Sequence, residues 1–249
     1  MKEKNLHYEM DFDALEQAVT EDTGVLVLCN PHNPVGRVYT RAELEQTAAF
    51  TERHHLLVVS DEIHCELTLE GEHIPFFSLN DRVKDYSITL SSAGKIANIP
   101  SLPSGFAIIP SQELRRRFQD ISLGLFSTPN ALSFEALHAA FDGSCDEWKE
   151  ELRDYLRENR DYLESRIAGI DGLRVVHNEG TYLAWIDARD TGIEDPFAFF
   201  KEKAGVRFNN GADYGQKGFV RLNFGCPRSQ LKEALDRVEA ALQAYRAAQ

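Results

Sequence analysis

The sequence of 249 residues has only four cysteines, and their arrangement excludes a disulfide framework. Cys29, Cys65, Cys145 and Cys226 are scattered, with no CxxC pair and no histidine at metal-ligand spacing. Such usage is typical of reduced thiols in a cytoplasmic protein, and it predicts no metal site.

Long apolar runs and an excess of positive charge are also missing. No apolar stretch approaches the length that crosses a bilayer, and the polar, acidic N-terminus does not resemble a signal peptide. Lysine and arginine number 27 against 40 acidic residues, giving a net charge of -13 that disfavours contact with nucleic acid or anionic lipid. We therefore expect a cytoplasmic protein that binds neither nucleic acid nor membrane.

The first two thirds of the sequence alternate short apolar runs with amphipathic helical stretches. This pattern is typical of crossover units that build a largely parallel sheet. Four apolar runs are expected to be its strands, at residues 25–29, 56–60, 86–90 and 106–109. Thr40 and Glu43 form a capping box, which predicts a helix that runs to about His54. The expected fold class is α/β.

From Cys145 the pattern changes to one long helix. Its apolar residues fall near one face, and they are Trp148, Leu152, Tyr155, Leu156, Tyr162, Leu163 and Ile167. After it we expect strands at 173–176, 181–186, 206–208 and 219–224, and then a closing helix with an apolar stripe over 231–245. The change predicts a large domain over 1–144, followed by the connecting helix and a small α+β domain over 145–249.

Polar side chains of different chemistry follow three of the predicted strands. Asn33 lies in a proline-containing loop after the first, Asp61 and His64 follow the second, and Lys95 follows the third. Ligands bind beyond the carboxyl ends of open parallel sheets, so this edge is a candidate ligand site. Taken singly, Asp61 could be a turn or helix cap, and Lys95 a solvated loop residue. Together, an amide, a carboxylate and an amine match the requirements of pyridoxal 5'-phosphate.

Four segments carry a more specific resemblance: NPHNPVGRVYT, VVSDEIHCEL, TLSSAGK and FVRLNFGCPRSQLKEAL. They resemble the class I/II aminotransferases, which are fold type I pyridoxal-phosphate enzymes, and among these the cystathionine β-lyases of the MalY and PatB type. The resemblance covers nearly the whole chain. It implies the later part of the fold type I large domain, a mostly parallel sheet with helices, followed by a C-terminal small α+β domain.

The resemblance also implies a role for each matching residue in the cofactor site. Lys95 would form the Schiff base with pyridoxal phosphate and act as the catalytic residue. Asp61 would pair with the pyridinium nitrogen, and Asn33 would donate to the phenolic oxygen. His64 would contact the cofactor, and Ser92 would bind its phosphate.

The same resemblance implies that Arg221 binds the α-carboxylate of the substrate through a bidentate pair. Read from the residue alone, Arg221 could instead form an interdomain salt bridge. Tyr182 and Trp185 also follow the family's wording, although core packing explains both. A lone loop histidine such as His32 is more often structural than functional.

The chain departs from the family pattern at two places. Around the lysine, relatives usually read S-K-[TS]-F-N, whereas this chain has the run Gly94-Lys95-Ile96-Ala97-Asn98, which lacks the hydroxyl just before the lysine and the aromatic just after it. Pro103 stands where aminotransferases often place a phosphate-binding arginine. The family also has a long segment before the matching region, so we expect this chain to be N-terminally truncated.

The expected activity is that of a carbon-sulfur β-lyase that releases thiol, pyruvate and ammonia from a small amino acid, a cysteine thioether. An aminotransferase is an alternative, because Lys95 and Asp61 serve both reactions. A catalytically silent remnant that only dimerises or binds a partner is a further alternative. The resemblance implies a homodimer.

Overall fold

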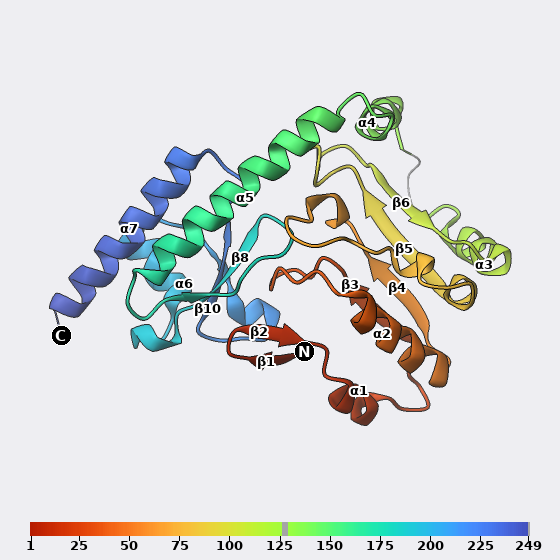
Figure 1. Ribbon diagram of the computed structural model, residues 1–249, viewed down its shortest axis with the longest axis horizontal. Helices are drawn as coiled ribbons and strands as arrows, with labels where there is room; N and C mark the ends of the chain where they lie inside the picture. Colours follow the sequence, from red (N-terminus) through yellow and green to blue (C-terminus); the bar gives the residue numbers. More distant parts are fainter. Residues whose placement is uncertain (126–128, 249) are drawn as a thin grey trace.

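A four-stranded sheet forms the first layer of the computed structural model, which describes residues 1–125 and 129–248 (Figure 1). Its strands, in spatial order, are β3 (Val25–Cys29), β4 (Leu57–Asp61), β5 (Ser87–Ser92) and β6 (Gly105–Ile108). The first three run parallel, and β6 runs antiparallel to β5. The predicted α/β class and the four strands are confirmed, with boundaries displaced by one or two residues.

Helix α2 (Arg41–Arg53) covers one face of this sheet. The Thr40 hydroxyl accepts from the Glu43 N–H, and the Glu43 carboxylate accepts from the Thr40 N–H, so the predicted capping box is present. Beneath the helix lies a core of Leu28, Tyr39, Leu44, Ala48, Val58, Phe76 and Val83. The apolar spacing of the helix and the buried strands therefore defines this layer.

The opposite face of the sheet is incompletely covered. Alternate side chains of β3 point to opposite faces, and Val25 and Val27, on the face away from α2, are 48% and 72% exposed. The strand register places Asp61 of β4 and Ser92 of β5 on the same face as Val27. Two of the predicted site residues therefore lie at the rim of an exposed apolar surface.

The other helices of the first two thirds surround this sheet. They are α1 (Phe12–Ala18), α3 (Gln112–Ser122) and α4 (Ala131–Phe141), with short 3-10 turns at Cys65–Leu67, Phe76–Ser78 and Arg82–Asp85. Figure 1 shows α3 beside the edge strand β6, and α4 near the start of the next helix.

A second sheet is built entirely from antiparallel pairs. In spatial order it contains β7 (Arg174–Val175), β8 (Leu183–Asp187), β10 (Phe219–Asn223) and β9 (Asn209–Asn210). The helices α6 (Pro196–Phe199) and α7 (Arg228–Ala247) follow β8 and β10. Its core includes Ala184, Ile186, Val220, Leu222, Leu231, Leu235, Val238 and Leu242. The closing helix is thus present, and its predicted stripe faces the core.

Helix α5 (Asp146–Ala168) runs from the first sheet to the second (Figure 1). Leu156, Leu163 and Ile167 are buried in the core of the second sheet. The predicted apolar stripe is wrong at two positions, because Trp148 and Tyr155 are 47% and 40% exposed. The first half of the helix lies beyond the second sheet, so a continuous apolar stripe has no continuous core to face. No helix in the described part of the chain is long and apolar enough to cross a membrane.

The N-terminal hairpin of β1 (Lys2–Lys4) and β2 (His7–Glu9) packs against the second sheet. Tyr8 of the hairpin lies in a buried cluster with Trp185 and Phe219. The division of the chain at residues 144 and 145 stays a prediction, and this contact shows that packing interactions cross it.

The expected strand at 206–208 is wrong. Val206 and Phe208 are buried, as the apolar character of the segment suggests, but only Asn209 and Asn210 pair with β10. The Val206 N–H instead donates to the carbonyl oxygen of Phe200, which closes the preceding helical turn. Burial alone therefore does not reveal which carbonyl oxygen accepts the hydrogen bond of a backbone N–H.

Candidate active site

The loop after β3 is held against the end of β4. The Asn30 N–H donates to the carbonyl oxygen of Asp61 at 3.0 Å, and the Asn30 side-chain oxygen accepts from the Tyr39 N–H. His32 forms a 2.7 Å hydrogen bond with the Tyr39 hydroxyl, which gives this histidine a structural role. These contacts fix the loop that carries Asn33.

Asn33 reaches across to the second sheet. Its side-chain oxygen accepts from Nη1 of Arg221 at 2.7 Å. Arg221 lies on β10, 188 residues further along the chain, so this contact joins two of the predicted site residues from different sheets. The amide nitrogen of Asn33 remains available as a donor to a ligand oxygen.

Two neighbouring carboxylates at the end of β4 have different surroundings. Asp61 lies on the exposed face, is partly buried, and accepts from the Ile63 N–H at 3.2 Å. Glu62 is fully buried and accepts from the Ser60 hydroxyl, the Phe76 N–H and His73. Glu62 is therefore committed to structure, whereas Asp61 can receive a ligand.

His64 is buried, and its Nδ1 has no hydrogen-bond partner among the described residues. Its ring meets the ring of Tyr182 edge-on, with centroids 5.8 Å apart. Burial, together with the charges of Lys95 and Arg221, lowers the pKa of His64 to about 4. The imidazole is thus neutral at pH 7, and it lies close enough to both cations to be affected by them.

Lys95 lies in a helical turn directly after β5, in which the Ala97 N–H donates to the Ala93 carbonyl oxygen. Ala93 and Ile96 are fully buried, and Ile96 belongs to the core beneath the second sheet. The apolar residue that replaces the family's usual neighbour therefore anchors the turn that presents Lys95.

A small cluster of donors lies next to Lys95. The Ser92 hydroxyl accepts from the Gly94 N–H at 2.9 Å and lies 3.1 Å from the hydroxyl of Ser104. A Cβ at Gly94 would lie 3.1 Å from the Ser92 hydroxyl, so glycine allows this close approach. Hydroxyl and amide groups of this kind can donate to phosphate oxygens.

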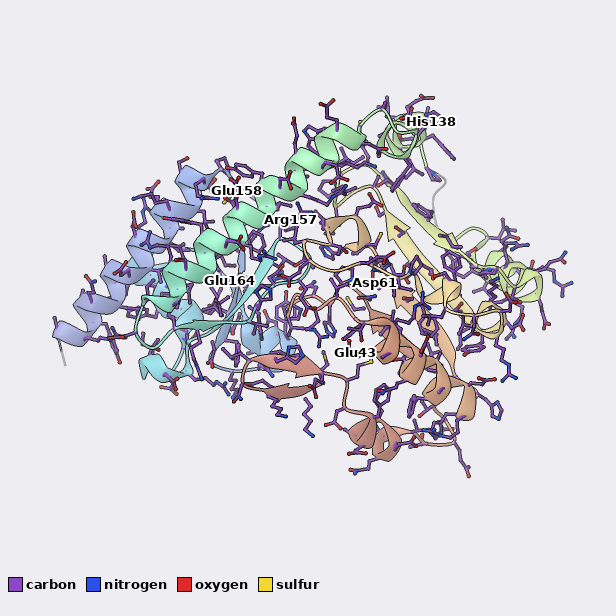
Figure 2. All side chains as sticks on the ribbon, viewed as in Figure 1. Glu43, Asp61, His138, Arg157, Glu158 and Glu164 are labelled. Carbon is purple, nitrogen blue, oxygen red and sulfur yellow. The ribbon has the colours of Figure 1, made fainter. Side chains whose placement is uncertain are left out.

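The predicted site residues therefore gather between the two sheets. Asn33 contacts Arg221, Lys95 and Arg221 act on His64, and Asp61 and Ser92 share one face of the first sheet. In Figure 2 Asp61 is labelled near the middle of the molecule, between the sheets. No group of three or more possible metal ligands occurs in the described ranges.

The donor set fits the cofactor that the resemblance implies. It combines an amine, a carboxylate, an amide, an imidazole and two hydroxyl groups from the ends of β3, β4 and β5 and the start of β6. Buried polar atoms are normally paired, yet the Nδ1 of His64 and the Nε of Arg221 are not. Two unpaired buried nitrogens at this position are consistent with a site that a polar ligand completes.

Sequence reasoning missed Ser104, Asn209 and Tyr214, which contact this site, and it explained Tyr182 by core packing. Ser104 contacts Ser92, whereas Asn209 and Tyr214 contact Arg221, and Tyr182, for which core packing is a sufficient explanation from sequence, contacts His64. The only signal for Ser104 is its position just before a predicted strand. Asn209 gives none, because it follows an expected strand that does not form.

A separate cavity of 820 Å³ lies at the other end of the parallel strands, between α2 and α3. None of the predicted site residues line it; Leu57, Tyr86 and Arg117 are among those that do. Because ligands of open parallel sheets bind at the carboxyl ends, we assign the site to the opposite edge.

We expect the free energy of unfolding to fall as the pH drops from 6.5 toward 4. The unfolded chain protonates His64 below about pH 6.5, whereas the native pKa of about 4 keeps the buried ring neutral. This difference costs about 1.4 kcal/mol for each pH unit, or about 2 kcal/mol at pH 5. Urea unfolding of the wild type and of His64→Gln at pH 7 and pH 5 measures it.

The His64→Gln variant should lose less stability than the wild type over this interval, by about 2 kcal/mol. His32, whose pKa is also lowered to about 4 by burial, contributes equally in both proteins. The matched control is His138→Gln, since the His138 side chain is 77% exposed (Figure 2). Equal losses in His64→Gln and His138→Gln would contradict the assignment.

The family model described as aminotransferase class I and II matches residues 2–238. Cystathionine β-lyase PatB of Bacillus subtilis (strain 168) is 34% identical over 248 residues, which cover 96% of this chain and 64% of PatB. Aspartate aminotransferases match at lower identity. The chain thus spans slightly less than two thirds of the length of the curated relatives it matches.

Solved structures agree with the fold. The structure of OvoB is 43% identical with a TM-score of 0.92, and the match covers 97% of this chain and 64% of OvoB. The pyridoxal-phosphate-bound C-S lyase of Staphylococcus hominis is 31% identical with a TM-score of 0.88, covering 97% of this chain and 63% of that one. The protein belongs to the aminotransferase class I and II family, whose fold its two sheets share.

Proposed function

We propose that this chain carries the cofactor and substrate residues of a pyridoxal-phosphate-dependent carbon-sulfur β-lyase. Its substrate would be an amino acid with a thioether at Cβ, and its products a thiol, pyruvate and ammonia. The observation that carries the proposal is the 2.7 Å hydrogen bond between Arg221 and Asn33. It brings a cation for the substrate carboxylate to the loop that would hold the cofactor ring. The names of the relatives, cystathionine β-lyase and C-S lyase, supply the reaction class.

Five residues would hold the cofactor. Lys95 would bond to it, Asp61 would hold the proton on its ring nitrogen, and the amide nitrogen of Asn33 would donate to its phenolic oxygen. His64 would contact the ring through its unpaired Nδ1, and Ser92 would bind the phosphate with the nearby hydroxyl of Ser104.

When bound, pyridoxal phosphate supplies a sink for the electron pair left at the substrate Cα. Arg221 binds the α-carboxylate and so orients the Cα–H bond toward the amine of Lys95. Once the amino group of the substrate has replaced Lys95 on the cofactor, the freed Lys95 amine would take the Cα proton. The electron pair then expels the sulfur at Cβ as a thiolate. The unsaturated amino acid that remains is hydrolysed to pyruvate and ammonia.

Two features favour a lyase over an aminotransferase. The sequence SDEIH places His64 where many aminotransferases have a tyrosine, and the segment RLNFGCPRS is lyase-like in wording. The His64 ring is held edge-on against Tyr182, with centroids 5.8 Å apart.

Incubation with L-cystathionine and pyridoxal phosphate tests the reaction class. A lyase releases pyruvate, ammonia and a free thiol without a keto-acid acceptor, because the leaving group departs from Cβ in every cycle. An aminotransferase stops after one turnover unless a keto acid is added, and a silent remnant gives only the slow rate of the free cofactor. Acceptor-dependent turnover would overturn the lyase assignment.

We expect Asp61→Asn to lower turnover far more than it lowers cofactor content. An amide still contacts the ring nitrogen but cannot stabilise its proton, so the loss falls on the carbanion-like transition state, on the order of a hundredfold or more. Pyruvate release and bound cofactor, measured on the same preparation, separate the two effects. Asp120→Asn is the control, since Asp120 is an exposed residue of α3. Equal losses of cofactor and rate would mark Asp61 as a structural cap.

The homodimer implied by the resemblance and the cytoplasmic location expected from the cysteine usage stay predictions. Gel filtration with light scattering measures the first, and cell fractionation the second.

A further inference from the structure

The guanidinium of Arg221 is held on three sides by neutral groups. Nη1 donates to the Asn33 side-chain oxygen at 2.7 Å, and Nη2 donates to the Asn209 side-chain oxygen at 3.0 Å. The ring of Tyr214 lies beneath it, 4.8 Å from Cζ to the ring centroid. A guanidinium has five N–H groups, so three remain after these two hydrogen bonds, enough for a bidentate pair with a carboxylate.

Other arginines of the chain are paired differently. Arg37 lies 3.0 Å from Glu43, Arg166 lies 2.8 Å from Asp236, and Arg189 lies 2.8 Å from Asp187. In the part of the chain that the structure describes, Arg221 forms no ion pair, so the alternative of an interdomain salt bridge finds no support there. Neutral partners orient a guanidinium without cancelling its charge, which stays available for an anion.

The backbone fixes both neighbours of Arg221 on the second sheet. Asn209 stands directly opposite Arg221 in the antiparallel pairing of β9 and β10. The Asn210 side chain then caps the 3-10 turn Gly211–Tyr214 by accepting from the Ala212 N–H. A Cβ at Gly211 would collide with the Phe219 carbonyl oxygen, so the turn needs glycine.

The ring of Tyr214 is supported in turn by the core. It meets Trp185 edge-on at 5.8 Å, and Trp185 stacks on Phe219 at 5.1 Å. Trp185 is almost completely buried, which makes it a rigid support. Tyr214 is itself 37% exposed, and its edge-on contact with the buried Trp185 holds its ring under the guanidinium.

We propose that Asn209 and Tyr214 are positioning residues, which hold the Arg221 guanidinium in the orientation that binds the substrate α-carboxylate. This inference rests on the proposed function and extends it to residues outside the four segments that resemble the family. Asn209 fixes the direction of Nη2, and Tyr214 fixes the plane of the group through its ring face. Neither residue needs to touch the reacting atoms.

Protection of Arg221 against phenylglyoxal tests the proposal without catalysis. The reagent modifies unpaired arginines, and peptide mapping of the 249-residue chain, supplied with pyridoxal phosphate, reports the rate at Arg221. L-cystathionine should protect Arg221 in the wild type. In Asn209→Ala the concentration of L-cystathionine that half protects Arg221 should rise about tenfold, because the guanidinium loses one charge-assisted hydrogen bond.

Asn209→Asp separates positioning from a purely structural role. A carboxylate at this position keeps the acceptor and the strand pairing, but it neutralises the charge that the substrate needs. If Asn209 is a positioning residue, the concentration of L-cystathionine needed for half protection should rise more than in Asn209→Ala, by about thirtyfold. A structural role predicts wild-type protection, because the new ion pair holds the side chains together.

Tyr214→Phe should retain protection, since the ring face is kept, whereas Tyr214→Leu should weaken it about fivefold. Asp213→Asn, an exposed change in the same turn, is the control and should match the wild type. Circular dichroism of each variant reports folding. Unchanged protection in both Asn209 variants, or no protection of Arg221 in the wild type, overturns the proposal. Protection without pyruvate release in the lyase assay rejects the lyase and leaves the positioning of Arg221 standing.

Discussion

Replacing Lys95 by alanine is expected to abolish the lyase reaction, with a loss on the order of a hundredfold to ten-thousandfold in rate, because the proposed Cα proton acceptor is removed. The side chain follows β5 in a turn anchored by the buried Ile96, so the substitution should leave the fold intact. Pyruvate release from L-cystathionine, with circular dichroism as the check on folding, measures the effect.

Lys95→Arg separates the chemical role of the amine from the effect of its positive charge. Arginine keeps the positive charge that acts on His64, but it cannot form a Schiff base or accept the Cα proton. Both variants should therefore lose activity equally. Lys203→Ala, which changes an exposed lysine, is the control and should keep the wild-type rate. Activity retained in Lys95→Arg would mean that only the charge matters.

Adding the part of PatB that lies outside the matched region is expected to raise the rate of this chain at least about a hundredfold. The sheet face that carries Asp61 and Ser92 is exposed at Val25 and Val27, so bulk water reaches the rim of the site. Covering that face fixes the side chains, and misplacement of about 1 Å can cost on the order of a hundredfold. The comparison is pyruvate release by the chain alone and by the fusion.

Val27→Asp provides the matched control for this result. Val27 is 72% exposed, so the substitution should change the stability of the chain alone by less than about 0.5 kcal/mol. In the fusion the same carboxylate would be buried in an apolar contact, and the gain in rate should be lost. Rapid pyruvate release by the unfused chain would show that the exposed face does not limit activity.

The sequence predicts those parts of the fold that local physics decides. The helix after Thr40 has both halves of its capping box, and α2 begins where the box requires. The strands β3 to β6 follow short apolar runs, and the polar residues after β3, β4 and β5 lie at one edge because parallel strands end together. The pattern of strands and loops alone is therefore enough to place Asn33, Asp61 and Lys95 near one another.

Long-range packing decides the rest. Trp148 and Tyr155 match the helical period of α5 but face no core, and Val206 and Phe208 are buried without pairing in a strand. Asp61 and Glu62 are adjacent in sequence, so their side chains point to opposite faces of the sheet. Only the strand register shows which of the two carboxylates lies on the face that α2 covers. The contact between Asn209 and Arg221 depends on a strand pairing that no local pattern indicates.

Lys95 is proposed as the residue that bonds to pyridoxal phosphate. Incubation of the chain with the cofactor, reduction with borohydride and peptide mapping by mass spectrometry test it most directly. One modified peptide is expected, labelled at Lys95, because this lysine follows β5, the neighbour of the strand that ends at Asp61, and its charge acts on His64 together with that of Arg221. A label spread over exposed lysines such as Lys203, or no label at all, would contradict it.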